Sequence, residues 1–74
     1  MLLDEVRDGR RLPTPATARL IRVTAGVSQA RLAKELGVHR MTIVRWESGQ
    51  RAPRGSHRAE YSRLLQQLKE AVAS

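Results

Sequence analysis

The amino-acid sequence predicts an all-α fold, a compact bundle of four or five helices. Three observations support this prediction. Apolar residues recur at helical spacing in four successive segments after residue 13. Residues that commonly cap helices, or glycines that commonly end them, stand at the boundaries between these segments. Finally, no segment has the apolar and polar alternation of a β-strand, and the sequence contains no repeat or low-complexity tract.

The first 13 residues differ from the rest and are expected to form an N-terminal arm. They mix apolar residues such as Leu2 and Leu3 with acidic ones, and they close on the basic pair Arg10 and Arg11 followed by Pro13. A folded domain is then expected to occupy residues 14–74, because the helical pattern begins there.

The first helix is expected to begin at Pro15. Thr14 can accept a backbone hydrogen bond as the N-cap, and proline at the first helical position loses no hydrogen bond. The helix then runs to about Ala25, where Gly26 stops it. Its apolar stripe is thin.

Leu20 and Val23 fall outside that apolar stripe. Three positions for them stay open: they pack under the arm, they pack under the last helix, or they contact a second subunit. The amino-acid sequence does not separate these alternatives.

The second helix is expected over about residues 28–36, with Ser28 as its cap and Gly37 as its end. The helix is short, and its inward face is apolar. This face consists of Leu32, Ala33 and Leu36.

A third helix follows at once, over about residues 39–48, and it stops at Gly49. Helical geometry places Ile43 and Trp46 on one face, so Trp46 is expected in the core. The opposite face carries Arg40, Met41, Val44 and Arg45. Two short helices joined by a tight glycine turn, the second with polar residues outward, have the layout of a helix-turn-helix.

A loop containing Pro53 and Gly55 separates the third helix from a long final helix over about residues 56–73. Apolar side chains follow one another there at helical spacing, so this helix is expected to supply much of the core. They are Tyr61, Leu64, Leu65, Leu68 and Val72.

The composition excludes several classes of protein. A chain of 74 residues has room for one small domain and none for a deep catalytic cleft. There is no cysteine and only two histidines, so we expect no metal site and no cofactor. No nucleophile has its base, so we expect no enzyme activity. The N-terminal sequence lacks a secretion signal, and no segment is apolar enough for a membrane span, so a cytoplasmic protein is expected.

The charge points to an anionic partner. Lys and Arg outnumber Asp and Glu by 14 to 7, which gives a formal net charge of +7. Such an excess favours nucleic acid first and a membrane surface second. Exposed aromatic rings, on which single-stranded bases stack, are almost missing, so double-stranded DNA is the expected partner.

The sequence VSQARLAKELGVHRMTIVRWESGQRAP closely resembles the Cro and lambda-repressor class of helix-turn-helix domains, the Xre-like group. Members of this class often read GxSQxxLAxxLGVSxxTIxRWExGxxxP. The positions that match are Gly26, Ser28, Gln29, Leu32, Ala33, Leu36, Gly37, Val38, Thr42, Ile43, Arg45, Trp46, Glu47, Gly49 and Pro53. The resemblance covers about residues 16–53, and a wider run from GRRLPTP through the last helix is similar to small actinobacterial or actinophage members.

This resemblance implies roles for individual residues. Base edges in the major groove would be contacted by Arg40, Met41, Val44 and Arg45. Phosphates would be contacted by Gln29, Arg31, His39, Thr42, Ser48 and Arg51. Arg22 and Glu47 match a pair that bridges the first helix to the end of the third.

The sequence departs from the family pattern in three places. Arg31 stands where a capping glutamate is common, and His39 replaces the usual serine cap. Residues 56–73 resemble one long helix, whereas family members commonly have two short ones, and this puts the usual dimer contact in doubt.

The function that follows is a sequence-specific double-stranded DNA-binding transcriptional regulator, repressor-like and associated with the nucleoid. A homodimer or cooperative pairs on DNA are expected, because one helix reads only a few base pairs. No small-molecule effector is evident. Two alternatives stay open: a recombination directionality or architectural factor that bends DNA, and a protein-binding adaptor of the anti-repressor or antitoxin kind.

Overall fold

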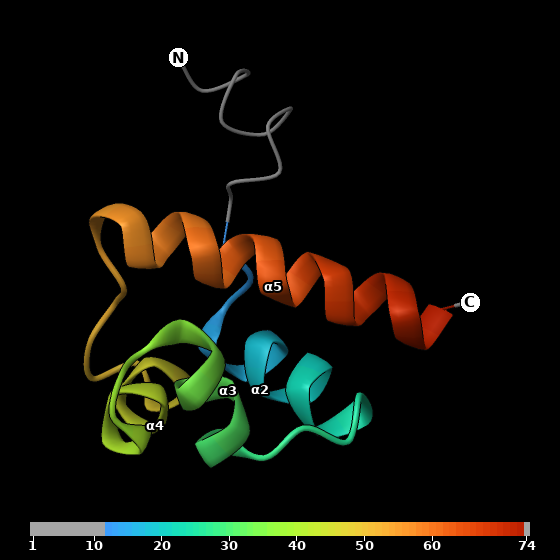
Figure 1. Ribbon diagram of the computed structural model, residues 1–74, viewed down its shortest axis with the longest axis horizontal. Coiled ribbons are helices and arrows are strands. Elements are labelled where there is room, and N and C mark those ends of the chain that lie inside the picture. The colour runs from blue at the N-terminus through green and yellow to red at the C-terminus, as the bar shows by residue number, and fades with distance from the viewer. Residues whose placement is uncertain (1–11, 74) are drawn as a thin grey trace.

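The computed structural model describes residues 12–73, which form four helices and no strand. These are α2 (Pro15–Thr24), α3 (Gln29–Leu36), α4 (Arg40–Ser48) and α5 (Gly55–Ala73). Short α2, α3 and α4 form one layer, and the long α5 lies across it (Figure 1). The expected all-α bundle is confirmed, with four helices in this part of the chain. Most of the expected N-terminal arm lies outside the described residues.

Two residues, Thr14 and Pro15, define the start of α2. The Thr14 hydroxyl accepts a hydrogen bond from the Thr17 backbone N–H at 3.2 Å, and Pro15 occupies the first turn. The Thr14 hydroxyl satisfies one open N–H group of the helix start, and Pro15 has no N–H that would need a partner. The helix ends at Thr24, one residue before the expected end, and Gly26 turns the chain with a φ of 73°.

The turn between α3 and α4 depends on Gly37. Its φ of 68° is left-handed, a region that side chains with a Cβ avoid. The Val38 N–H then donates to the Ala33 carbonyl at 3.0 Å, which closes the end of α3. Ser28 caps the other end, where its Oγ accepts from the Arg31 N–H at 3.0 Å. The two helices are therefore joined at a fixed angle.

The core lies between α5 and the layer beneath it. Leu32 of α3, Ile43 of α4 and Leu65 of α5 are fully buried, so each of these helices contributes a side chain to one cluster. The ring of Trp46 lies 4.9 Å from the ring of Tyr61, measured between centroids, which joins α4 to α5. Trp46 is thus a core residue, as its position on the helix predicted.

The apolar stripe of α5 supplies part of the core, as expected, and also extends beyond it. Tyr61 and Leu65 are buried, and Leu64 is partly buried against them. Val72, however, is 45 % exposed. The reason is visible in Figure 1, where the C-terminal part of α5 runs past the end of the helices beneath it. Helical spacing identifies the side of α5 that faces inward but not where the neighbouring helices end.

Leu20 and Val23 of α2 are 63 % and 50 % exposed. Three positions were considered for these side chains. The prediction that they are buried beneath α5 is therefore wrong, because most of their surface is exposed. Their place on α2 explains this exposure, because Ala18 and Arg22 form the buried face of the helix instead.

Candidate nucleic-acid interface

Helix α4 has one buried and one open face. Ile43, Trp46 and Glu47 are buried against the core. On the other side Arg40, Met41 and Arg45 are exposed, whereas Val44 and Thr42 are half-buried. The helix therefore presents two guanidinium groups and a thioether on a backbone that its inner face holds in place. Val44 is the least accessible of the four residues expected to contact bases.

A buried ion pair fixes the end of α4 to α2. Arg22 Nε donates to Glu47 Oε2 at 2.6 Å and Arg22 Nη2 donates to Glu47 Oε1 at 3.0 Å, a bidentate arrangement. The side chains are only 9 % and 3 % exposed. The hydrogen bond to Glu47 raises the pKa of Arg22, although burial opposes this shift. The pair suggested by the family resemblance is therefore formed, and it belongs to the core.

Arg22 also anchors the turn that follows its own helix. Its Nη1 donates to the Val27 carbonyl at 2.8 Å. All three nitrogens of the guanidinium group are thus used, which is the condition under which a buried charge is tolerated. The start of α3, the end of α2 and the end of α4 meet at this one side chain.

Gln29 connects the ion pair to the open face. Its Nε2 donates to Glu47 Oε1 at 3.2 Å, and its Oε1 accepts from Arg40 Nη1 at 3.5 Å. A row of hydrogen bonds therefore runs from buried Arg22 through Glu47 and Gln29 to exposed Arg40. This arrangement holds the first arginine of α4 beside the first residue of α3.

The other residues expected to contact phosphates differ in their exposure and in the bonds that their side chains already make. Arg31 is exposed and lies 3.7 Å from Glu35, one turn further along α3. His39 is exposed at the N-cap position of α4, and its side chain makes no capping hydrogen bond. The Ser48 hydroxyl donates to the Arg45 carbonyl at 3.1 Å, so a phosphate would have to replace that bond.

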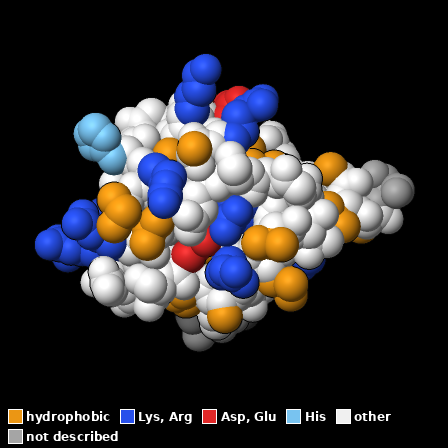
Figure 2. Space-filling view, turned by 90° about the horizontal axis from the view of Figure 1, so that it is seen from below, with side chains coloured by type: hydrophobic (Ala, Val, Ile, Leu, Met, Phe, Trp, Pro, Cys, Tyr) orange, Lys and Arg blue, Asp and Glu red, His pale blue; other side chains and the backbone are white. Residues whose placement is uncertain are grey.

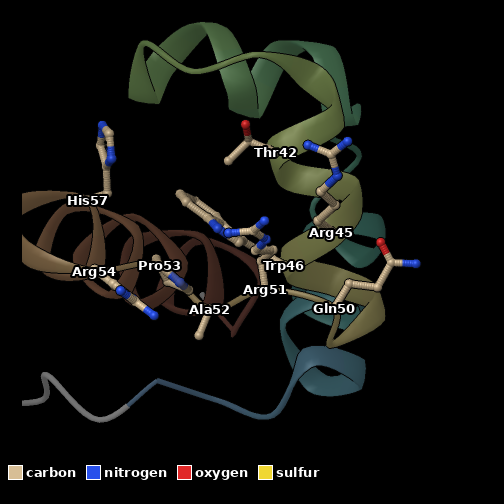
Figure 3. A pocket seen from close by; sticks show the side chains of 9 residues that line it. All are labelled: Thr42, Arg45, Trp46, Gln50, Arg51, Ala52, Pro53, Arg54 and His57. Carbon is tan, nitrogen blue, oxygen red and sulfur yellow. The ribbon is translucent and has the colours of Figure 1, made fainter.

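A cleft of about 520 Å³ opens beside α4, between its second half, the following loop and the first turn of α5 (Figure 3). It brings Thr42 and Arg51 together with Arg45, which were all predicted as site residues. It is lined by Thr42, Arg45, Trp46, Gln50, Arg51, Ala52, Pro53, Arg54 and His57.

Arg54 and His57 of this cleft were not among the predicted site residues. The sequence contains a pattern that could have identified them. After Gly49, residues that can carry positive charge stand three positions apart, at Arg51, Arg54 and His57. From the sequence, Arg54 fits a phosphate contact and a solvated linker equally well, and His57 is expected at the surface near a helix start. Their place beside one cleft depends on how the loop lies against Trp46, which only the folded structure reveals.

Basic side chains are scattered over the face of the molecule opposite α5. Figure 2 views the face opposite α5 and shows Lys and Arg side chains spread across it, with little acidic surface between them. Such a distribution produces a positive potential that attracts polyanions. None of the helices between residues 12 and 73 combines the length and hydropathy needed to cross a lipid bilayer.

Comparison with known proteins agrees with this geometry. A protein-family model described as "Helix-turn-helix" matches residues 19–69, which is more than half of the chain. The chain belongs to the Cro/C1-type (Xre-like) helix-turn-helix family. The matched residues include all of α3 and α4 and the turn between them, together with most of α2 and α5. Searches of curated proteins and of solved structures give no match.

Membership in this helix-turn-helix family makes the protein a DNA-binding regulator. Helices α3 and α4, joined by the glycine turn, have the layout of the two helices of the motif. An α-helix with side chains is about as wide as the major groove, roughly 12 Å, so α4 can enter the groove side-on.

Proposed function

We propose that this helix-turn-helix protein is a sequence-specific transcriptional regulator of the repressor type, which inserts α4 into the major groove of double-stranded DNA. One observation supports this proposal most directly: the backbone of α4 is held in place by its buried side chains, while its other face carries exposed positive charges. Glu47 fixes α4 from inside through Arg22, while Arg40 and Arg45 remain exposed on the outside. Groups that are held in position before binding lose less entropy when they bind.

The side chains of α4 suit a mixed sequence of guanines and thymines. A guanidinium can donate two hydrogen bonds to guanine O6 and N7, so Arg40 and Arg45 would each favour a guanine. Met41 is half exposed and can cover a thymine methyl group. Val44 is half-buried, so its contact with a methyl group would require a close approach of the helix.

The surrounding polar residues would fix the position of α4 on the duplex. Gln29 keeps one amide hydrogen beyond its bond to Glu47, and this hydrogen is available to a phosphate at the start of α3. The remaining phosphate contacts are assigned to Arg31, His39, Thr42, Ser48 and Arg51. Contacts of this type add affinity on every sequence and make it dependent on salt.

One copy of α4 spans only a few base pairs. Useful discrimination within a genome requires more, so two copies are expected to bind together on a symmetric or repeated site, as a homodimer or as cooperative pairs. The regulator would then act at the nucleoid.

Selection of bound fragments from a random duplex library tests this proposal at near-physiological salt. We expect a consensus that contains guanines and has two related half-sites. Enrichment of bent or kinked sequences without a base consensus would favour an architectural or recombination directionality factor. No enrichment, together with a stable complex with one cellular protein, would favour an adaptor and contradict the proposal.

A further inference from the structure

An apolar groove lies between α2 and α5. Its volume is about 580 Å³, and none of its lining residues belongs to α3 or α4. Buried Leu65 and half-buried Ile21 line it, together with Leu20, which is 63 % exposed. A bound segment that covered Leu20 would remove this apolar surface from water, which is favourable.

The chain enters the domain along this groove. Leu12 and Pro13, the first two described residues, belong to its lining, and Leu12 packs against the hydrophobic core. Figure 1 shows this stretch, in blue, beside α5 before α2 begins. The 11 residues that precede Leu12 are therefore attached directly to the groove. We propose that the first eight of them, the N-terminal segment MLLDEVRD, bind in the groove of their own chain.

The composition of this N-terminal segment matches the groove. Half of its eight residues are apolar, and the other half consists of three acidic residues and one arginine. The segment is thus acidic in a chain whose formal net charge is +7. The groove lining contains Lys69 and no carboxylate, and exposed Arg58 stands one turn before Ser62 on the same side of α5. Apolar contact and opposite charge therefore favour the same binding.

The N-terminal segment is long enough to reach every part of the groove. On α5 the lining extends from Ser62 to Lys69, about 10 Å along the helix axis. Leu3 precedes Leu12 by nine residues, which span up to about 30 Å when extended. Attachment at Leu12 also makes the binding intramolecular, so little translational freedom is lost when the segment binds.

A second copy of the chain fits the groove less well. Stable contacts between two proteins bury about 800 Å² on each partner. The groove extends over about two turns of α5, which suits a short segment rather than a second folded domain. Because neither α3 nor α4 lines the groove, the segment can bind there while the open face of α4 stays accessible.

A double-mutant cycle tests the contact between the N-terminal segment and the groove. The variant L3S/V6S removes two apolar side chains of the segment, and L20S removes the exposed leucine of the groove. We expect L3S/V6S to raise the unfolding equilibrium constant, measured by urea titration, about fivefold or more in the parent protein and much less in L20S. V23S is the matched control, because Val23 is also an exposed apolar residue of α2 but does not line the groove. In V23S the full effect of L3S/V6S should remain.

A nitroxide label at position 4 locates the N-terminal segment. The chain has no cysteine, so the variant D4C provides a single attachment point. The label broadens the NMR signals of amides that lie near it. We expect stronger broadening at Leu20 and Gln66 of the groove than at Lys34 of α3, and we expect the double substitution in the segment to remove this difference.

The proposal requires both results. Additive effects of L3S/V6S and L20S would overturn it, and so would broadening that L3S/V6S leaves unchanged. A mixture of labelled and unlabelled chains identifies the chain that is bound. Broadened signals from the unlabelled chains would show that the segment binds a second copy, which also overturns the proposal. Neither test uses DNA, so a negative result leaves the proposed function unaffected, and a failure to bind DNA leaves the groove proposal unaffected.

Discussion

Arg22 and Glu47 form a bidentate ion pair inside the core, with Arg22 Nε 2.6 Å from Glu47 Oε2. The two residues belong to α2 and α4, so this one pair sets how α4 is held against the rest of the domain. Glu47 also accepts from Gln29, which contacts Arg40 at the surface. Core packing and the placement of exposed Arg40 are therefore linked through a single carboxylate.

Replacing Glu47 with Ala should strongly destabilise the fold. The change leaves the Arg22 guanidinium buried without its anion, which typically costs about 3–5 kcal/mol. The free energy of unfolding from urea titration measures this effect. The double variant R22M/E47L should regain most of the stability, because it replaces both charges with apolar groups. A loss below about 1 kcal/mol in E47A would mean that water replaces the carboxylate and that the pair is not a core element.

Gln29 should act on DNA recognition through Arg40. The variant Q29A removes the amide that Arg40 contacts while leaving the bidentate Arg22 and Glu47 pair in place. We expect Q29A and R40A each to weaken discrimination at the same base pair, and the double variant to discriminate little worse than either single one. Loss of the phosphate contact proposed for Gln29 weakens all sequences alike and leaves this discrimination unchanged. Binding titrations on duplexes that differ at single base pairs provide the double-mutant cycle. Additive losses at unrelated positions would show that the two side chains act separately.

The stability of the protein should fall at alkaline pH because of Tyr61. Its hydroxyl is buried and has no hydrogen-bond partner among residues 12–73. Burial, and to a smaller extent the charge of Glu47, raise the pKa of Tyr61 from 10.0 to about 12. The unfolded chain therefore loses the phenolic proton first, so stability is retained below pH 10 and decreases as the pH rises to 12. The expected decrease is about 2 kcal/mol.

The variant Y61F is the control for this pH dependence. It keeps the ring that packs against Trp46 and removes only the titrating hydroxyl. At pH 7 its stability should equal or exceed that of the parent protein, because an unpartnered buried hydroxyl contributes nothing favourable. Between pH 10 and 12 the parent should lose stability relative to Y61F. Equal pH profiles would show that the phenol titrates in the folded state as it does in water.

Local chemistry explains why the helices were predictable. Thr14, Ser28 and Gly37 cap or end helices through bonds to neighbouring residues, and these bonds depend on a few residues of sequence. The two faces of α4 follow from the helical repeat in the same way. Residues with roles set by the chain nearby are therefore recognisable before folding.

Features that depend on distant parts of the chain were not predictable. Helical periodicity placed Val72 on the inner side of α5, but α5 outruns the helices below it and leaves Val72 exposed. The family resemblance paired Arg22 with Glu47 without indicating that both are buried. The cleft formed by Arg51, Arg54 and His57 arises only when the loop folds back on Trp46. In each case the deciding quantity is the relative position of elements far apart in sequence.

We expect Arg45 to contact the bases of a single base pair. The variant R45A should lose preference at that position at a cost of about 1–3 kcal/mol and keep its preferences elsewhere. Arg31→Ala, at an exposed position on α3, is the matched control and should weaken all sequences alike. If R45A lost the same binding free energy on every duplex, Arg45 would contact only phosphate and not a base.

Methylation interference on the selected duplex tests most directly whether the cationic face of α4 enters the major groove. Methyl groups on guanine N7 occupy the atom that a guanidinium would contact there. We predict that N7 methylation at particular guanines blocks binding of the parent protein, and that one of these positions loses its effect in R45A. Binding that is indifferent to guanine N7 methylation throughout the site would contradict insertion of α4 into the major groove.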